Sequence, residues 1–274
     1  MQGGMAQLND SVERFIGREA ELRRLLAALR KRQSQLLWGP IDAGKTSLMK
    51  RALKQLPEAE QRTCIWWTGP AGRRELIEQF VQGLYLAGDA FVRRKVHTDR
   101  CSEATLGRWI NAQSALRLRG ILFTASEQGE YRFIVDHLPS VTHTIAQLLK
   151  ELMYRTKTPI YLTGHGYTQA EIGYAWSLYW SDEYRIRVGA LAETPARELL
   201  EQCIRSFGLN SLDLTGFRED VLRLSGQLPG SIMKMCELAA NPRYHYGDQV
   251  KVKLVHVDYL LRGNCFRSFA AGAS

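Results

Sequence analysis

The segment with the clearest chemistry runs from residue 39 to residue 47. It reads Gly-x-x-x-x-Gly-Lys-Thr-Ser between a short apolar run and an amphipathic one, which is the setting of a phosphate-binding loop. In such a loop, backbone N–H groups and the start of the next helix face an anion. Lys45 can reach the β- and γ-phosphates, and the Thr46 hydroxyl can bind Mg²⁺. The sequence therefore predicts a nucleoside triphosphate site with ATP and Mg²⁺ as cofactors. Its residues would be Gly39, Pro40, Ile41, Asp42, Ala43, Gly44, Lys45, Thr46 and Ser47.

A carboxylate for the metal is expected at the end of another strand. Asp136 follows the run Phe-Ile-Val at residues 133–135, which has the composition of a buried strand. Mg²⁺ prefers hard oxygen ligands and keeps several waters, so one carboxylate beside the loop is sufficient. We predict that Thr46 and Asp136 bind the metal; an ordinary acid at a strand end is the alternative.

The residue after Asp136 departs from what efficient hydrolysis requires. A second carboxylate there would orient and polarise the attacking water, but the chain has His137. A neutral imidazole can accept a proton, yet it brings no fixed negative charge. Hydrolysis is therefore expected to be slow, partner-dependent or absent, unless Glu127, Glu130 or Asp182 supplies the carboxylate.

A further polar position lies at the end of the apolar run at residues 159–163. A side chain at such a strand end can detect the γ-phosphate by a hydrogen bond, and Thr163 is the first candidate, with His165 second. A strand-to-helix turn with a capping hydroxyl explains the same residues, and the sequence leaves both interpretations open.

Short apolar runs alternate with amphipathic stretches up to about residue 190. Strands are expected at residues 35–38, 63–67, 132–136, 159–163 and 184–188. Helices are expected between them, and one of these carries Leu106, Trp109, Ile110 and Leu116 on its apolar face. The alternation predicts an α/β fold with a five-stranded parallel sheet covered on both faces.

Beyond Thr194 the pattern becomes helical. Thr194 is expected to cap a helix with Pro195 at its first position, and further helices are expected near residues 217–224 and 229–239. Residues 250–256 alternate like a strand but fit the approach to a last helix equally well. We expect an α/β nucleotide-binding domain over residues 1–192 and a small helical lid domain over residues 193–274.

The composition is ordinary for a globular protein, with 45% hydrophobic and 24% charged residues. No apolar run approaches a membrane span, no hydrophobic signal segment is evident, and the five cysteines form no CxxC pair. These features predict a cytoplasmic protein with reduced thiols and no membrane partner.

The formal net charge of +9 favours a polyanionic partner, with nucleic acid, and so DNA, as the first candidate and acidic lipid as the second. Solvated helix faces explain the same basic clusters. The clusters are Arg23, Arg24, Arg30, Lys31 and Arg32, then Arg93, Arg94, Lys95 and Arg100, then Arg117 and Arg119.

With these motifs in order, the chain resembles the AAA+ and STAND groups of P-loop ATPases, nearest the origin-recognition-like and archaeal-type branch. Residues 15–22, Phe-Ile-Gly-Arg-Glu-Ala-Glu-Leu, resemble the box that contacts adenine in these groups. The resemblance implies that Ile16, Gly17 and Arg18 bind the nucleotide.

Residues 224–230, Leu-Ser-Gly-Gln-Leu-Pro-Gly, resemble the Gly-x-x-Pro element of the lid. Pro229 stands where typical AAA+ proteins have an arginine on the γ-phosphate, and the STAND-like role implied for it is packing on the adenine. The resemblance also implies an arginine finger before the fifth strand. Arg185 is the candidate, and a surface arginine at a strand edge is the alternative.

These observations favour an ATP-binding AAA+/STAND-like ATPase that acts as a nucleotide-dependent switch, with a protein partner or a homo-oligomer. A DNA-associated ATPase of replication, transposition or defence is an alternative. A hydrolysis-deficient ATP-binding scaffold is another, suggested by His137. A phosphotransferase for a small molecule is disfavoured by the adenine box and the lid element.

Overall fold

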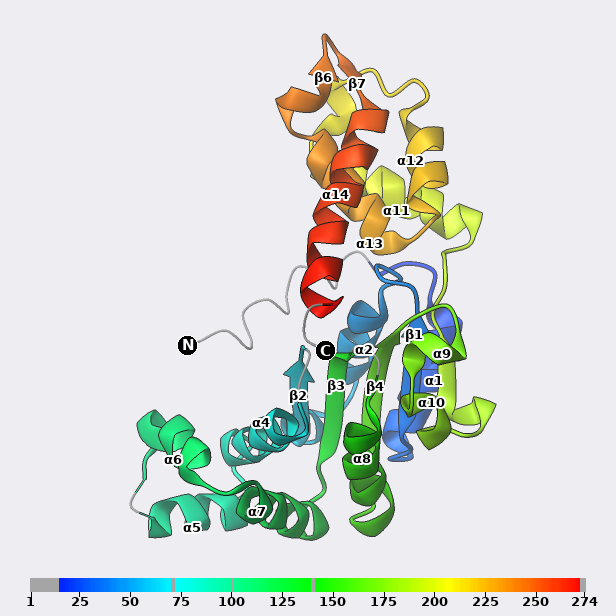
Figure 1. The fold of residues 1–274 in the computed structure, drawn as a ribbon. Helices are drawn as coiled ribbons and strands as arrows, with labels where there is room; N and C mark the ends of the chain where they lie inside the picture. Colours follow the sequence, from blue (N-terminus) through cyan, green and yellow to red (C-terminus); the bar gives the residue numbers. More distant parts are fainter. Residues whose placement is uncertain (1–14, 70–71, 100, 139–140, 272–274) are drawn as a thin grey trace. The chain divides into compact units, whose positions relative to one another are not determined.

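The structure, a computed structural model, describes residues 15–69, 72–99, 101–138 and 141–271 (Figure 1). The chain forms two compact units. The sheet unit comprises residues 22–39 and 52–187, and the helical unit comprises residues 1–21, 40–51 and 188–274. The phosphate-loop segment is thus counted with the C-terminal helices. The division expected at residue 192 stays a prediction.

The sheet unit contains a five-stranded parallel sheet with the order β2-β3-β4-β1-β5. The five expected strands are therefore confirmed, and β4 lies between β1 and β3. Their bounds are β1 Gln35–Gly39, β2 Cys64–Thr68, β3 Arg132–Leu138, β4 Ile160–His165 and β5 Arg185–Arg187.

Two strands run further than predicted. β3 continues past Asp136 to Leu138, and β4 continues through Gly164 to His165 instead of breaking there. The pairing of β3 with β4 shifts register between Val135 and Leu138. This irregularity accommodates His137, whose φ is 57°, near the end of the strand. A pattern of apolar residues does not reveal such an irregularity.

Successive side chains of a strand point to opposite faces of the sheet, and both faces are covered by helices. Leu36, Val135 and Leu162 belong to the apolar core that also contains side chains of α4, α7 and α8. Tyr161 points the other way, and its hydroxyl donates to the carbonyl oxygen of Ala28 in α1, at 3.4 Å. The two buried faces explain why the strands read as nearly continuous apolar runs.

The helices up to β5 follow the predicted alternation with the strands. Their bounds are α1 Glu19–Arg30, α2 Lys45–Leu53, α3 Glu58–Arg62, α4 Arg73–Leu86, α5 Ala90–Thr98, α6 Leu106–Ala112, α7 Ala115–Gln128, α8 His143–Arg155, α9 Gln169–Ile172 and α10 Ala175–Leu178.

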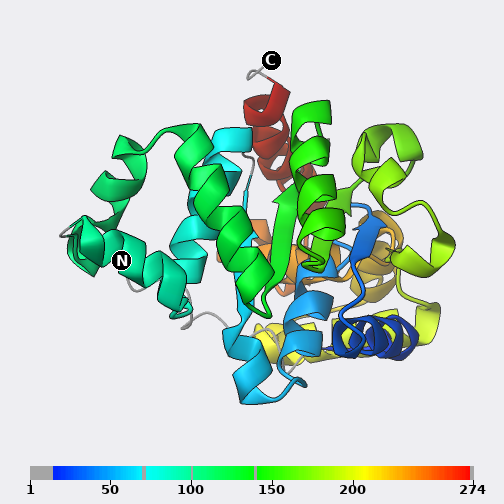
Figure 2. The ribbon, with the colours of Figure 1, turned by 90° about the horizontal axis from the view of Figure 1, so that it is seen from below.

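The segment between β2 and β3 differs from the prediction of one helix through Leu116. The chain breaks after α6, and the Ser114 hydroxyl caps α7 by accepting from the Arg117 N–H at 3.2 Å. Leu116 then lies on the outside of α7 with 77% of its surface exposed. The helices α5, α6 and α7 gather beside α4 (Figure 2).

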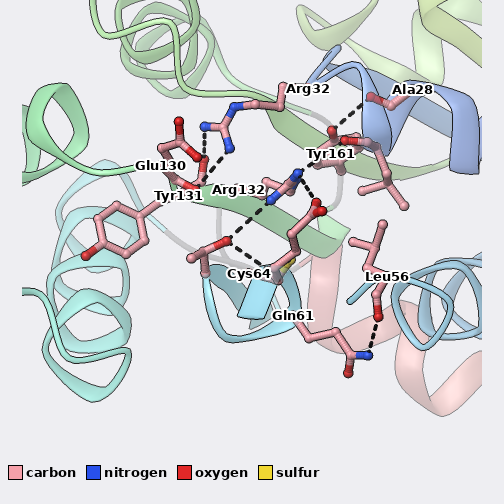
Figure 3. Close-up of polar contacts among 12 residues, drawn as sticks. Ala28, Arg32, Leu56, Gln61, Cys64, Glu130, Tyr131, Arg132 and Tyr161 are labelled. Atoms are coloured by element: carbon pink, nitrogen blue, oxygen red, sulfur yellow. Dashed lines mark hydrogen bonds and ion pairs between the residues drawn. The ribbon is translucent and has the colours of Figure 1, made fainter. Parts of the chain in front are cut away.

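A polar cluster around the buried Arg132 lies at the amino end of the sheet (Figure 3). Arg132 opens β3 with only 4% of its side chain exposed, and it pairs with Glu60 at 2.5 Å. Its guanidinium also donates to the carbonyl oxygen of Leu29 at 3.4 Å. Arg32 donates to the carbonyl oxygens of Glu130 and Tyr131 at 3.1 and 3.2 Å. Side chains therefore connect α1, α3 and β3 at the end opposite Asp136.

The C-terminal part is helical, as predicted. Its helices are α11 Glu193–Ser206, α12 Phe217–Ser225, α13 Pro229–Ala239 and α14 Val252–Ala271, with a small hairpin of β6 His245–Tyr246 and β7 Gln249–Val250 (Figure 1). Their apolar faces share one core that includes Leu200, Cys203, Val221, Ile232 and Met235. None of the described helices is both long and apolar enough to cross a membrane.

One local expectation in this part was wrong, and one question left open by the sequence was decided. Thr194 does not cap α11, because the helix already begins at Glu193 with Ala192 as its N-cap. Of the two alternatives for residues 250–256, the approach to a last helix is confirmed, because α14 begins at Val252 and only Gln249–Val250 pairs with β6. Alternation over seven residues was too short to separate a strand from a helix entry.

Candidate nucleotide-binding site

The phosphate loop lies between β1 and α2, as the motif requires. β1 ends at Gly39, and α2 begins at Lys45. Between them, Asp42 and Gly44 adopt left-handed backbone conformations with φ of 66° and 88°. Lys45 is buried, and its Nζ donates to the carbonyl oxygen of Pro40 across the loop at 2.6 Å. The chain thus curls around its own lysine, in the manner of an anion-binding loop.

Thr46 and Ser47 occupy the first turn of α2, as predicted. The first N–H groups of a helix have no partner within the helix, and the positive end of its dipole favours an anion. This turn is therefore suited to a phosphate group.

Arg18 connects the loop to the segment that precedes the C-terminal helices. Its side chain is 9% exposed, and Nη2 donates to the carbonyl oxygen of Ala43 at 3.3 Å and to that of Gly189. Nη1 donates to the carbonyl oxygen of Ala190 at 3.4 Å. The guanidinium therefore links three separate segments of the helical unit by charge-assisted hydrogen bonds.

The other residues of the expected adenine box pack against the C-terminal helices of the same unit. Ile16 packs against its apolar core. Gly17 has φ of 71°, and a Cβ at this position would lie 2.5 Å from Cβ of Pro195 in α11. Only glycine fits here, because both the backbone conformation and the close approach exclude a side chain.

The start of α13 lies on the phosphate loop. A Cβ on Gly44 would lie 3.4 Å from Cγ of Pro229, and the Gly230 N–H donates to the carbonyl oxygen of Asp42 at 2.9 Å. The helical unit thus brings together three predicted segments that are far apart in the sequence: residues 16–18, the loop and Pro229. A contact of any of them with adenine stays a prediction.

The sheet unit supplies the acidic position. Asp136 is 1% exposed, and the buried Thr163 hydroxyl of the neighbouring strand β4 donates to its Oδ1 at 2.5 Å. The same hydroxyl accepts from the backbone N–H of His137 at 2.9 Å. Thr163 therefore fixes the orientation of the carboxylate, whatever else its hydroxyl contacts.

His137 has an unusual backbone conformation for a residue in a strand. Its φ of 57° lies in the left-handed region, within the irregular stretch of β3. Its Nδ1 lies 2.9 Å from Nε2 of His165, and its Nε2 lies 3.6 Å from Oδ2 of Asp136. The His137 imidazole therefore lies between the Asp136 carboxylate and the His165 ring. One ring nitrogen must donate and the other accept, so the two rings fix each other's orientation.

These groups fit a magnesium ion better than a metal held by the protein alone. Among the residues that the structure describes, no group of three or more His, Cys, Asp or Glu side chains could hold a metal. Mg²⁺ commonly takes one or two carboxylates and completes its shell with water and phosphate oxygens.

The acids considered as substitutes for a second carboxylate do not accompany Asp136. Glu130 precedes the amino end of β3, and Glu127 pairs with Arg155 at 3.3 Å. Asp182 precedes β5, with its side chain fully exposed. In the sheet unit the carboxylate is contacted by the Thr163 hydroxyl and the His137 ring.

Arg185 lies at the amino end of β5, paired in register with Leu36. β5 and β3 are three strand spacings apart, roughly 14 Å. The Arg185 guanidinium stacks 4.0 Å from the ring centre of Trp176, and its side chain is 12% exposed. An arginine finger acts on a neighbouring subunit, so this position leaves that role a prediction.

Many arginines of the basic clusters make contacts inside the chain. Arg24 donates to the carbonyl oxygens of Asp182 and Arg185. Arg117 pairs with Asp99, and Arg119 pairs with Glu151. Arg100 lies outside the described residues. These contacts explain part of the basic surplus by internal roles.

Comparison with known proteins identifies the fold. A Walker-type ATPase of Pyrococcus abyssi superimposes with a TM-score of 0.59 at 17% sequence identity, covering 95% of this chain and 77% of that chain. The ORC1 protein of Aeropyrum pernix, solved in complex with DNA, gives a TM-score of 0.54 at 17% identity, covering 92% and 68%. This chain has the fold of an AAA+-like P-loop ATPase. No protein-family model matches the sequence, and no curated protein does.

Within this P-loop ATPase fold, sequence reasoning missed the side chains that contact the loop from the helices. Lys234 of α13 and Tyr259 of α14 both bond the Asp42 carboxylate, at 2.7 and 3.0 Å. The unusual acid inside an anion-binding motif was the available signal. Its partners lie about 190 and 217 residues later in the chain, beyond the reach of any local pattern.

Proposed function

We propose that the chain binds ATP and Mg²⁺ and acts as a nucleotide-dependent switch with slow or partner-stimulated ATP hydrolysis. One observation carries this proposal: the phosphate loop is contacted within the helical unit by both Arg18 and the start of α13. A helix that touches the loop can respond to what the loop binds.

In this proposal the site residues divide the tasks of binding and hydrolysis. Lys45 and the N–H groups of the loop bind the phosphates, and Thr46 and Asp136 bind Mg²⁺. The ion would neutralise phosphate charge and orient the triphosphate. Thr163 holds the Asp136 carboxylate in place and is also our candidate contact to the γ-phosphate. His137 is the candidate proton acceptor for the attacking water.

The switch follows from differential contacts. A ligand shifts a conformational equilibrium only by as much as its affinity differs between the two states. Pro229 and Gly230 lie against the loop, so a bound triphosphate and a bound diphosphate would support the start of α13 differently. Protein partners or further copies of the chain would recognise the resulting surface.

Amide hydrogen exchange tests the switch directly. Exchange in α13 and α14 should differ between ATP–Mg²⁺ and ADP–Mg²⁺ in the wild type, and Lys45→Ala should show no such difference. Identical exchange with ATP, ADP and no nucleotide in the wild type would reject the switch.

The His137→Glu variant tests the reason proposed for slow hydrolysis. It supplies the missing carboxylate and removes the hydrogen bond to His165. Steady-state turnover should rise, and His137→Gln, which brings no charge, should not produce the gain. Equal turnover in wild type and His137→Glu would show that the missing carboxylate does not limit the rate.

A DNA-associated ATPase is the second candidate, favoured by the net charge of +9 and by the similarity to a protein solved in complex with DNA. Duplex binding should then weaken steeply between 50 and 200 mM salt, by about tenfold or more, because counterions are released on binding. Flat, weak binding across that range would remove this candidate. Mass measurement in solution with ATP, with and without duplex, would show whether assembly accompanies binding.

A further inference from the structure

The phosphate loop contains an acid where an anion is expected to bind. Asp42 lies between Pro40 and Gly44, in the part of the loop whose N–H groups would face phosphate. An unpaired carboxylate there would repel a triphosphate, since like charges a few ångströms apart interact strongly when water screens them poorly. The loop therefore needs a device that offsets this charge.

The helical unit provides such a device. The ammonium group of Lys234 lies 2.7 Å from Oδ1 of Asp42, and the Tyr259 hydroxyl donates to Oδ2 at 3.0 Å. The Tyr259 oxygen is itself 2.7 Å from the Ser231 hydroxyl. The Asp42 side chain is only 12% exposed, whereas that of Lys234 is 54% exposed. The carboxylate is thus enclosed, and both of its oxygens have partners from α13 and α14.

The backbone contacts at the same place are equally close. The Gly230 N–H bonds the carbonyl oxygen of Asp42, and a Cβ on Gly230 would lie 2.8 Å from Cβ of Asp42. Asp42 also has the left-handed φ of 66°, which costs a residue with a side chain conformational free energy. The acid is therefore held in an unfavourable conformation by several contacts that all come from the helical segment.

We propose that Lys234 determines the affinity of the loop for nucleotide phosphates by neutralising Asp42. This inference rests on the proposed ATP binding and assigns a role to residues that the phosphate-loop motif does not include. The neutralising charge comes from α13, so contact of α13 with the loop and phosphate binding strengthen each other. Such coupling is reciprocal: nucleotide should stabilise the Asp42–Lys234 contact as much as the contact favours nucleotide.

The role differs from that of a lysine that binds phosphate directly. If Lys234 acts by offsetting Asp42, its removal matters only while Asp42 is charged. If Lys234 binds the phosphate itself, its removal weakens binding whether or not the acid is present. A double-mutant cycle separates these cases.

Nucleotide binding is to be measured by calorimetry with ATP–Mg²⁺ and ADP–Mg²⁺ for wild type, Lys234→Ala, Asp42→Asn and the double variant. We expect Lys234→Ala to weaken ATP binding about tenfold, and ADP binding less because ADP carries less charge. Asp42→Asn in the Lys234→Ala background should restore ATP affinity to within about threefold of the wild type. Lys253→Ala, an exposed lysine at the start of α14, is the matched control and should leave both affinities unchanged.

Two results would overturn the inference while leaving the proposed function intact. One is wild-type ATP affinity in Lys234→Ala. The other is a double variant as weak as Lys234→Ala alone, which would assign Lys234 to direct phosphate binding. A wild-type protein that binds no ATP would instead reject the proposed function, and this inference with it. Circular dichroism of each variant confirms that the helices remain folded.

Discussion

The hydroxyl of Thr163 is the central support of the acidic position, and its removal should be costly. It donates to the Asp136 carboxylate at 2.5 Å and accepts from the His137 N–H at 2.9 Å, while Thr163 itself is fully buried. Thr163→Val keeps the shape of the side chain and removes both bonds.

The magnitude follows from the two bonds. A hydrogen bond to a charged group contributes about 1.5–3 kcal/mol, and one between neutral groups about 1 kcal/mol. Thr163→Val should therefore lower the free energy of unfolding by about 3 kcal/mol. Thr163→Ser retains the hydroxyl and loses one methyl group, so its cost should be only about 1 kcal/mol.

Urea unfolding followed by far-UV circular dichroism measures both variants. The expected result is a clear separation, with Thr163→Val unfolding at lower urea than Thr163→Ser. If Thr163→Val is as stable as Thr163→Ser, the hydroxyl does not hold the carboxylate and the account of this position is wrong.

Two further predictions concern the amino end of the sheet. Glu60→Gln should lower the free energy of unfolding by about 3 kcal/mol, and Arg132→Met by about 1–2 kcal/mol. The first variant costs more because it leaves the buried guanidinium of Arg132 without its carboxylate partner. In Arg132→Met the carboxylate of Glu60 loses its partner but can reach water, because the Glu60 side chain is 39% exposed whereas that of Arg132 is 4% exposed. Equal losses of stability in urea unfolding would contradict this reasoning. Burial raises the pKa of the Cys64 thiol to about 11 from its ordinary 9.0, so alkylation at pH 8 should be slow until the protein unfolds. Because the pKa of the Cys64 thiol is higher in the folded protein, the neutral thiol contributes stability that is complete below pH 9 and is lost as the pH rises toward 11. The wild type should therefore lose stability relative to Cys64→Ala between pH 8.5 and 10.5. A stability difference that stays constant over this range would argue against it.

The elements with strong periodicity were predictable from the sequence. The strands β2, β3 and β4 contain several β-branched and aromatic residues each. The helix α13 begins at the predicted Pro229, because proline is well tolerated in the first turn of a helix. The segment around Leu116 was not, because its apolar residues fit one helix as well as two. There the side-chain cap at Ser114 starts a second helix, and a serine among other polar residues does not by itself predict such a cap.

The site was predictable only where a motif is local. The loop motif is contiguous, so its position at the start of α2 followed from the sequence. The left-handed conformation of His137 and the bonds from Thr163 to Asp136 arise from pairing between β3 and β4, which no local pattern encodes. The contact of Lys234 with Asp42 is likewise set by the packing of helices on the loop.

Binding of ATP by the loop is the claim on which the account depends, and equilibrium titration with ATP and Mg²⁺ tests it most directly. Wild type and Lys50→Ala, a second lysine of α2, should bind with similar affinity, whereas Lys45→Ala should lose binding by at least about a hundredfold. Undiminished ATP binding in Lys45→Ala, or none in the wild type, would contradict the account.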